Sequence, residues 1–172
     1  NPSRTSFTFK GWTGSNGETP KKNPKITKGS TGDKSYTAHW CRSCSASNGA
    51  TCSVSLNSSN TCVYTTECSR AGYVIANNGK YNPVCTAAVY TISYELNSGI
   101  NHSSNPSSDT VESNDITIQN PSITSYTFAG WTGSNGTTPK KKPKITKGST
   151  GDKSYTAHWC QNCASVSHGS CS

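Results

Sequence analysis

The chain has few of the features from which a large hydrophobic core is built. Hydrophobic residues make up 30 % of its 172 residues, against roughly 45–50 % in a typical soluble globular chain. The mean hydropathy is −0.69. No apolar run approaches the roughly 20 residues that a membrane-spanning helix needs, and no apolar pattern of helical period is present. These absences exclude one large core and membrane insertion, and they favour several small sheets with thin cores.

The sequence also lacks methionine and the usual arrangements of catalytic side chains. The glycine-rich stretch KGSTGDKS is no phosphate-binding loop, because aspartate takes the place of the glycine that must precede Lys-Ser. No nucleophile–base pair or carboxylate pair can be assigned from the spacing of the four histidines, which are His39, His102, His158 and His168. We therefore expect no enzyme activity and no cofactor, in what we take to be a piece of a longer exported polypeptide.

Cysteine, by contrast, is abundant, with nine in the chain. Six form one cluster, and the cluster holds a single C-x-x-C pair, whereas a four-cysteine zinc site usually has two. A dense cluster in an exported chain favours disulfides over a metal, although His39, two residues before Cys41, leaves zinc as the alternative. The predicted disulfide residues are Cys41, Cys44, Cys52, Cys62, Cys68 and Cys85. Six cysteines allow about fifteen pairings, of which we favour Cys41–Cys52, Cys44–Cys62 and Cys68–Cys85.

The sequence repeats itself. A shift of 119 positions places Asn1 on Asn120 and Trp40 on Trp159 without a gap, and the stretch KITKGSTGDKSYTAHWC is identical at residues 25–41 and 144–160. Such a fixed period is the signature of an array. The period divides the chain into half a repeat (1–40), a Cys-rich disulfide module (41–87), a complete repeat (88–159) and the start of the next Cys-rich module (160–172).

Four segments of the complete repeat alternate in the manner of strands. They are residues 89–96, 115–119, 125–131 and 153–159, separated by stretches rich in Gly, Asn, Pro and Ser. We therefore predict a mainly β fold. The residues expected to face inward are Tyr90, Ile92, Tyr94 and Leu96 (or their odd-numbered neighbours), Ile116, Ile118, Tyr126, Phe128, Trp131, Ile145, Tyr155, Ala157 and Trp159.

Three motifs resemble a known family. YTISYELNSG at residues 90–99, SYTFAGW at 125–131 and YTAHW at 155–159 are similar to the Listeria–Bacteroides repeat, which includes the B-repeat of internalin-type surface proteins. The last two motifs recur in the half repeat, at residues 6–12 and 36–40. The resemblance implies β-grasp-like domains, here alternating with the disulfide module, and a place outside the cell, on a bacterial surface or secreted. It supplies no catalytic residues.

Two lysine-rich runs account for much of the net charge of +8. They leave two functions open. Either the chain is a structural segment of an extracellular stalk or fibre, with the lysines blocking a sheet edge, or it is an adhesin that binds anionic cell-wall or host glycans through them. The candidate polyanion-binding residues are Lys21, Lys22, Lys25, Lys28, Lys140, Lys141, Lys142, Lys144 and Lys147. Neighbouring copies of the repeat are expected partners, and nucleic acid is not.

The half repeat lacks counterparts of residues 88–119, which precede Asn120 in the complete repeat. Strands 89–96 and 115–119 have no counterpart ahead of residues 1–40, so Phe7, Phe9 and Trp12 are expected to lack cover, and a sheet edge is expected to stay open. Two sources of the missing strands are conceivable. They are residues ahead of Asn1 in a longer chain, or a neighbouring molecule.

Overall fold

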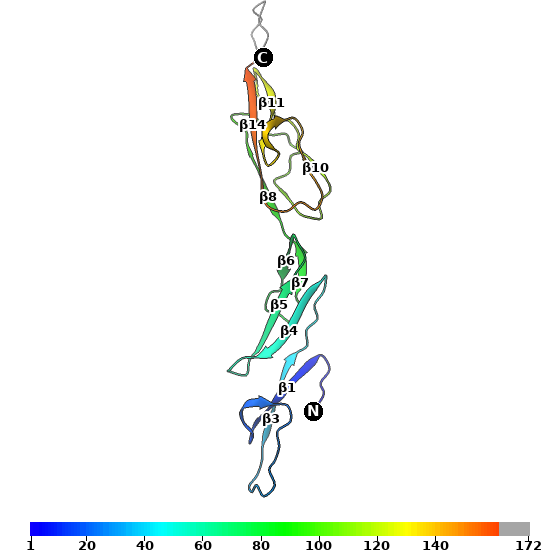
Figure 1. Ribbon diagram of the computed structural model, residues 1–172, viewed down its shortest axis with the longest axis vertical. Helices are drawn as coiled ribbons and strands as arrows, with labels where there is room; N and C mark the ends of the chain where they lie inside the picture. Colours follow the sequence, from blue (N-terminus) through cyan, green and yellow to red (C-terminus); the bar gives the residue numbers. More distant parts are fainter. Residues whose placement is uncertain (162–172) are drawn as a thin grey trace, which may run out of the picture. The chain divides into compact units, whose positions relative to one another are not determined.

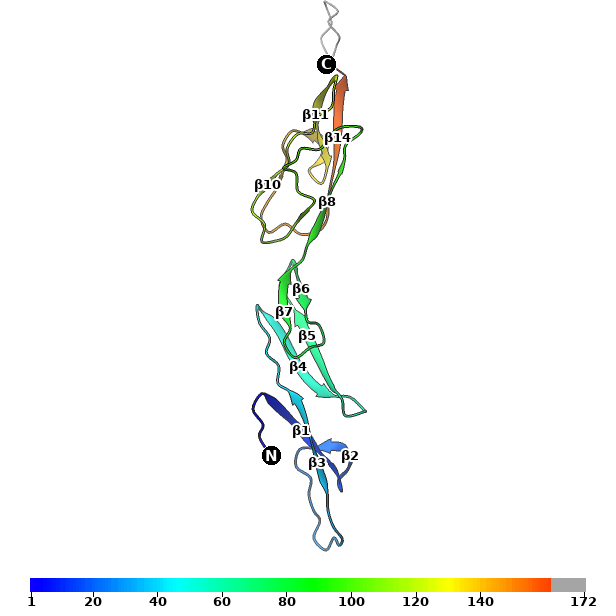
Figure 2. The ribbon, with the colours of Figure 1, turned by 180° about the vertical axis from the view of Figure 1, so that it is seen from behind.

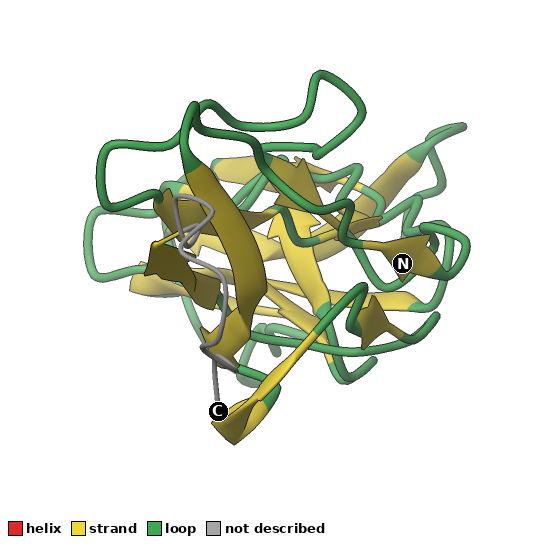
Figure 3. Cartoon of the chain, turned by 90° about the horizontal axis from the view of Figure 1, so that it is seen from above, coloured by secondary structure: helices red, strands yellow, loops and turns green. Residues whose placement is uncertain are grey.

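The computed structural model describes residues 1–161, and these form strands, turns and loops without a helix (Figures 1 and 3). The mainly β class predicted from the sequence is confirmed. The chain divides into two compact units, Asn1–Thr86 and Ala87–Ser172. The predicted start of a further Cys-rich module, residues 160–172, lies almost entirely outside the described residues.

The second unit is built on one five-stranded sheet, with the order β12-β11-β14-β8-β9. Its strands are β8 (Tyr90–Glu95), β9 (Ser108–Asp109), β11 (Tyr126–Gly133), β12 (Gly136–Lys140) and β14 (Lys153–Gln161). Strands β14 and β8 run parallel, whereas the other neighbours are antiparallel. A separate two-stranded pair joins β10 (Ile116–Thr117) to β13 (Lys144–Ile145). Residues 88–119, which we call the leading segment, therefore contribute β8, β9 and β10.

A bulge in β11 places two large aromatic residues on one face of the sheet. Phe128 lies opposite Trp159 and Gly130 lies opposite His158, so that Ala129 is the extra residue. Without the bulge, Phe128 and Trp131 would point to opposite faces. Gly130 has a φ of +150°, and a Cβ there would lie 2.8 Å from the backbone nitrogen of Lys140. The Phe-x-Gly-Trp motif is thus the sequence signature of this bulge.

The core of the second unit lies against the inner face of the sheet and follows the predicted set closely. Its buried members are Ile92, Ile118, Phe128, Trp131, Ile145, Tyr155 and Ala157, and Tyr94, Leu96, Ile116 and Trp159 pack against them. The prediction for Tyr126 was wrong, since its side chain is 42 % exposed. Tyr126 pairs with Gln161 at the end of the sheet, beyond the last core layer.

The first unit begins with a smaller sheet of the same design (Figure 2). Strands β1 (Phe7–Gly14), β2 (Gly17–Lys21) and β3 (Tyr36–Arg42) are arranged in the order β2-β1-β3. Phe9 lies opposite Trp40 and Gly11 opposite His39, which is the register of the equivalent residues in β11 and β14. We call residues 1–40 the first copy and residues 120–159 the second copy. In the first copy β3 is an edge strand.

The rest of the first unit is the disulfide module, made of two hairpins. Strand β4 (Ala50–Leu56) pairs with β5 (Cys62–Cys68), and β6 (Tyr73–Ala76) pairs with β7 (Val84–Ala87). Burial alternates residue by residue along β4 and β5, as in a strand with one covered face. The fully buried side chains of the module are Cys41, Pro83 and Cys85. Apolar cover is therefore thin, and the disulfides carry much of the packing.

Candidate functional site

The leading segment is joined to the second copy through the residues of the repeat motifs. The Asn97 amide donates to the carbonyl of Ala157 at 2.8 Å, and the Trp159 indole donates to the carbonyl of Leu96 at 3.0 Å. A Cβ on Gly99 would collide with the Trp159 ring. The Asn-x-Gly turn and the closing Tyr-x-Ala-x-Trp motif thus fit each other, and the two motifs describe one contact.

Tyr94, Tyr155 and the buried Asp109 form a small polar cluster within the same core. Burial raises the pKa of the Tyr94 phenol to about 12, with Tyr155 and Asp109 adding to the rise. Burial, followed by Asp109, also raises the pKa of Tyr155. The Tyr94 hydroxyl donates to the carbonyl of Pro106 at 2.9 Å, which only the neutral phenol can do. These shifts are a result of packing, and they hold both phenols in the neutral form.

All six clustered cysteines form disulfides, and two of the three predicted pairings were wrong. The bonds are Cys41–Cys62, Cys44–Cys52 and Cys68–Cys85, of which the last is the predicted one. Cys62 lies opposite Leu56 near the turn of the β4–β5 hairpin, and Cys52 lies farther from that turn, opposite Thr66. The chain leaving β3 meets the turn end first, so Cys41 reaches Cys62 and Cys44 reaches Cys52. The sequence alone does not show which end of the β4–β5 hairpin lies nearer to β3.

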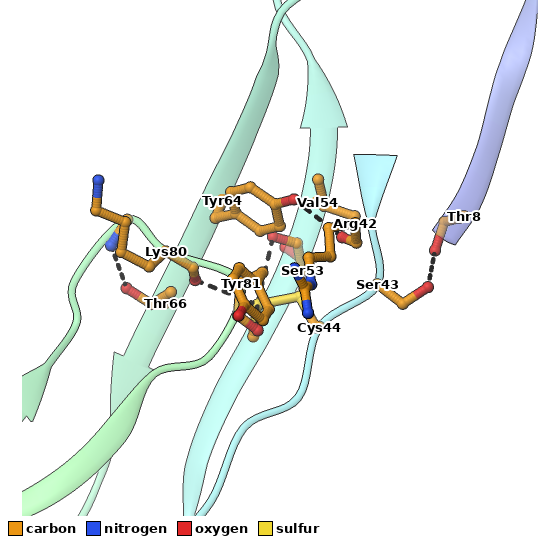
Figure 4. The surroundings of a disulfide bond; sticks show 12 residues. Thr8, Arg42, Ser43, Cys44, Ser53, Val54, Tyr64, Thr66, Lys80 and Tyr81 are labelled. Carbon is orange, nitrogen blue, oxygen red and sulfur yellow. Dashed lines mark hydrogen bonds between the residues drawn. A yellow bond between two sulfur atoms is a disulfide. The ribbon is translucent and has the colours of Figure 1, made fainter. Parts of the chain in front are cut away.

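Polar contacts also fasten strands β1 and β3 to the rest of the disulfide module. The hydroxyl of Tyr64 donates to the carbonyl of Arg42 at 2.9 Å, and the hydroxyls of Thr8 and Ser43 lie 3.0 Å apart. Figure 4 shows both pairs. The guanidinium of Arg42 lies 4.2 Å from the centre of the Tyr81 ring. Because Cys41 belongs to β3 itself, the sheet continues into the module without a linker.

Lys10 makes a contact that the second copy lacks. It is the bulge residue of β1, at the position of Ala129, and its ammonium donates to the carbonyl of Val54 in β4. Burial lowers the pKa of Lys10, and the charge of Lys22 lowers it further. Bulges often redirect a side chain, and here the bulge directs Lys10 to the module. The two copies differ here in sequence, but the sequence does not show that the lysine reaches β4.

The nine candidate polyanion-binding lysines are all exposed. Lys21 and Lys140 end β2 and β12, which are edge strands that also contain Pro20 and Pro139. Lysine and proline at such edges hinder pairing with other chains. Of these nine, Lys22 alone is among the residues lining a cavity of about 490 Å³ in the first unit, together with Trp12 and Tyr36.

Residues 1–161 contain neither a metal-ligand cluster nor a helix that could span a membrane. No group of three or more His, Cys, Asp and Glu side chains in that range is placed to hold a metal ion. The same range contains no helix of the length and apolar character needed to cross a membrane. Cys160, the counterpart of Cys41, is an exposed free thiol.

Comparison with known proteins gives one match. Residues 90–158 match the family model of the Listeria-Bacteroides repeat domain. No curated protein and no solved structure matches the chain. The matched range contains the first two sequence motifs in full and the third as far as His158. Residues 90–158 are therefore similar to the Listeria-Bacteroides repeat domain, and the three disulfides are of the kind that persists in an oxidising environment.

Proposed function

We propose that this chain is a structural segment of an extracellular stalk or fibre on a bacterial surface, in which sheet repeats alternate with disulfide modules and no catalysis takes place. The observation that carries the proposal is the continuity of β3. Its residues pair with β1 up to Arg42, and Cys41 within it is bonded to Cys62 of the module. A joint built in this way transmits force through a strand and a covalent bond, which suits a load-bearing spacer. Flexible tethering would instead use a Gly/Ser-rich linker.

Backbone ¹⁵N relaxation tests this proposal directly. Amides of β1–β3 and of β4–β5 should tumble as one body in the unmodified chain. A double variant, Cys41→Ser with Cys62→Ser, should show faster independent motion of the two parts. The matched control is Cys68→Ser with Cys85→Ser, which removes a disulfide inside the module and should leave the joint intact. Independent tumbling in the unmodified chain would contradict a load-bearing joint.

A second function, adhesion to anionic glycans or teichoic acids, is supported by the exposure of the nine lysines. Binding of a glycerol-phosphate polymer should then weaken steeply with salt. The triple variant Lys140→Ser, Lys141→Ser and Lys142→Ser should reduce that salt dependence, whereas Lys80→Ser, outside both runs, should not. Equal binding by all three proteins would rule out the lysine runs as the binding surface.

A further inference from the structure

Asparagine followed by glycine is prone to lose its side-chain amide, because glycine has no Cβ to keep its backbone nitrogen away from the asparagine Cγ. The chain contains four such pairs, which are Asn16-Gly17, Asn48-Gly49, Asn78-Gly79 and Asn135-Gly136. All four asparagines lie in turns of the described part of the chain. The dipeptide is the same in each pair, so the surrounding fold decides which of them can react.

Two of the pairs are held by the sheets of the two copies. The amides of Asn16 and Asn135 donate to the carbonyls of Trp12 and Trp131, at 2.6 Å and 2.7 Å. Their side-chain oxygens are buried without a hydrogen-bond partner, so the negative charge that attack at Cγ places on such an oxygen would not be solvated. Each turn also joins two paired strands, β1 to β2 and β11 to β12. Attack at either side chain therefore requires the turn to open first.

The third pair is held at both of its reacting groups. The hydroxyl of Thr66 donates to Oδ1 of Asn78 at 2.7 Å. The N–H of Gly79, whose nitrogen would attack, donates to the same hydroxyl at 3.1 Å. Thr66 belongs to β5. This strand therefore restrains the pair, even though the Asn78 side chain is exposed.

The turn at Asn48 has none of these restraints. The Asn48 side chain is exposed, and among the described residues its amide has no hydrogen-bond partner. Asn48 and Gly49 have φ of +51° and +81°, and the N–H of Ala50 donates to the carbonyl of Ser47 at 3.0 Å, as in a two-residue type I′ turn. Strand β4 follows the turn, but residues 43–46 before it form no strand. Opening this turn therefore breaks no antiparallel ladder.

We propose that Asn48 is a self-modification site, at which the backbone nitrogen of Gly49 converts the side-chain amide into a carboxylate. The nitrogen loses its proton to water or hydroxide and attacks Cγ of Asn48, and the side-chain nitrogen leaves as ammonia. Water then opens the resulting cyclic imide at either carbonyl, which gives aspartate or isoaspartate at position 48. In total, one water is consumed and one ammonia is released. This inference does not depend on the structural or adhesive role proposed above.

Arg70 is placed to favour the charged species of this reaction. Its guanidinium donates to the carbonyl of Asn48 at 3.3 Å and lies 3.6 Å from the centre of the Tyr73 ring. A cation beside the turn stabilises both the deprotonated nitrogen of Gly49 and the carboxylate of the product. The Cys44–Cys52 disulfide spans the turn, so the two sides stay joined when isoaspartate lengthens the backbone between them.

The test incubates the full, disulfide-bonded chain in mildly alkaline buffer and follows all four asparagines by peptide mass mapping. Asn48 should lose its amide at least about fivefold faster than each of the others, because these must first break a hydrogen bond. Electron-transfer fragmentation should find both aspartate and isoaspartate at position 48. The peptides that contain Asn16 and Asn135 are told apart by Glu18 and Thr137. Equal rates at the four sites would refute the proposal.

Two controls separate the fold from the local sequence. In the reduced chain in denaturant, all four asparagines should react at similar rates. If Asn48 keeps its lead there, the local sequence selects it and the assignment fails. The variant Thr66→Val keeps the shape of the side chain and removes the hydroxyl, so Asn78 should react faster in the folded chain while Asn16 and Asn135 do not. An unchanged rate at Asn78 would contradict protection by hydrogen bonds, and with it the reason given for the reactivity of Asn48.

Discussion

Replacing Ile145 and Ile26 by alanine, one at a time, makes the same change in the same local sequence in two environments. Ile145 is 4 % exposed and packs in the core of the second unit, opposite Ile116. Ile26 is 63 % exposed. A buried isoleucine replaced by alanine costs about 2–5 kcal/mol, from lost transfer energy and the cavity left behind. We expect about 3 kcal/mol for Ile145→Ala, because its side chain is nearly fully enclosed.

The same change at Ile26 should cost less than about 1 kcal/mol, since most of that side chain already contacts water. Urea unfolding followed by two-dimensional NMR resolves the two units, because each has amides in unique sequence. The free energy of unfolding is read separately from Ser93 in the second unit and Val54 in the first. Equal losses at the two sites would refute the reasoning, since the leading segment would then not be what stabilises the isoleucine.

Three further predictions concern pH, redox chemistry and the joint. Because the pKa of Tyr94 is raised to about 12, its neutral form stabilises the second unit fully below about pH 10, the unfolded value. That stability falls as pH rises toward 12, by about 1–2 kcal/mol after allowance for solvent screening. Alkaline unfolding followed by circular dichroism should show this loss of stability. The variant Tyr94→Phe should make the loss smaller. Limited reduction should open the Cys44–Cys52 disulfide first, because both of its cysteines are partly exposed, whereas each of the other two disulfides contains a fully buried cysteine. Alkylation of the released thiols followed by mass mapping identifies the first bond to open. Labelling of Cys41 or Cys85 before Cys44 and Cys52 would contradict the prediction. Lys10→Ala should destabilise the first unit by about 0.5–1.5 kcal/mol in urea unfolding, because the hydrogen bond from Lys10 to Val54 is lost. Lys10→Met, which keeps the aliphatic part of the side chain, should lose a similar amount. If neither variant changes the stability, Lys10 does not stabilise the joint.

The sequence predicted the sheet of the complete repeat well because alternation and turn residues act locally. Three predicted strands appear as β8, β11 and β14 with ends within two residues, whereas the predicted strand at residues 115–119 is only Ile116–Thr117. That strand is short because its partner, β13, is itself two residues long. Partner length is a tertiary property, and no local pattern encodes it.

The disulfide pairing and the bulge were harder to predict from the sequence than the strands were. Residue types identified the six disulfide cysteines, but pairing depended on which end of the β4–β5 hairpin faces β3. The bulge at Ala129 was hidden because Phe-x-Gly-Trp reads as an irregular strand until the register is known. By contrast, the incompleteness of the first copy was visible from the 119-residue offset alone, because a repeat provides its own reference.

The bulge position in β1 and β11 has a consequence for long arrays. Tandem domains of near-identical sequence tend to misassemble with one another, because each half fits every other half. The first copy differs from the second at few positions. Two of the differences are Lys10, which corresponds to Ala129, and Glu18, which corresponds to Thr137. Both line one cavity of about 330 Å³ together with the hairpin residues Leu56, Asn57, Ser58 and Asn60. A bulge residue can vary without disturbing the ladder, and the two copies accordingly keep the same register although one has lysine and the other alanine at this position.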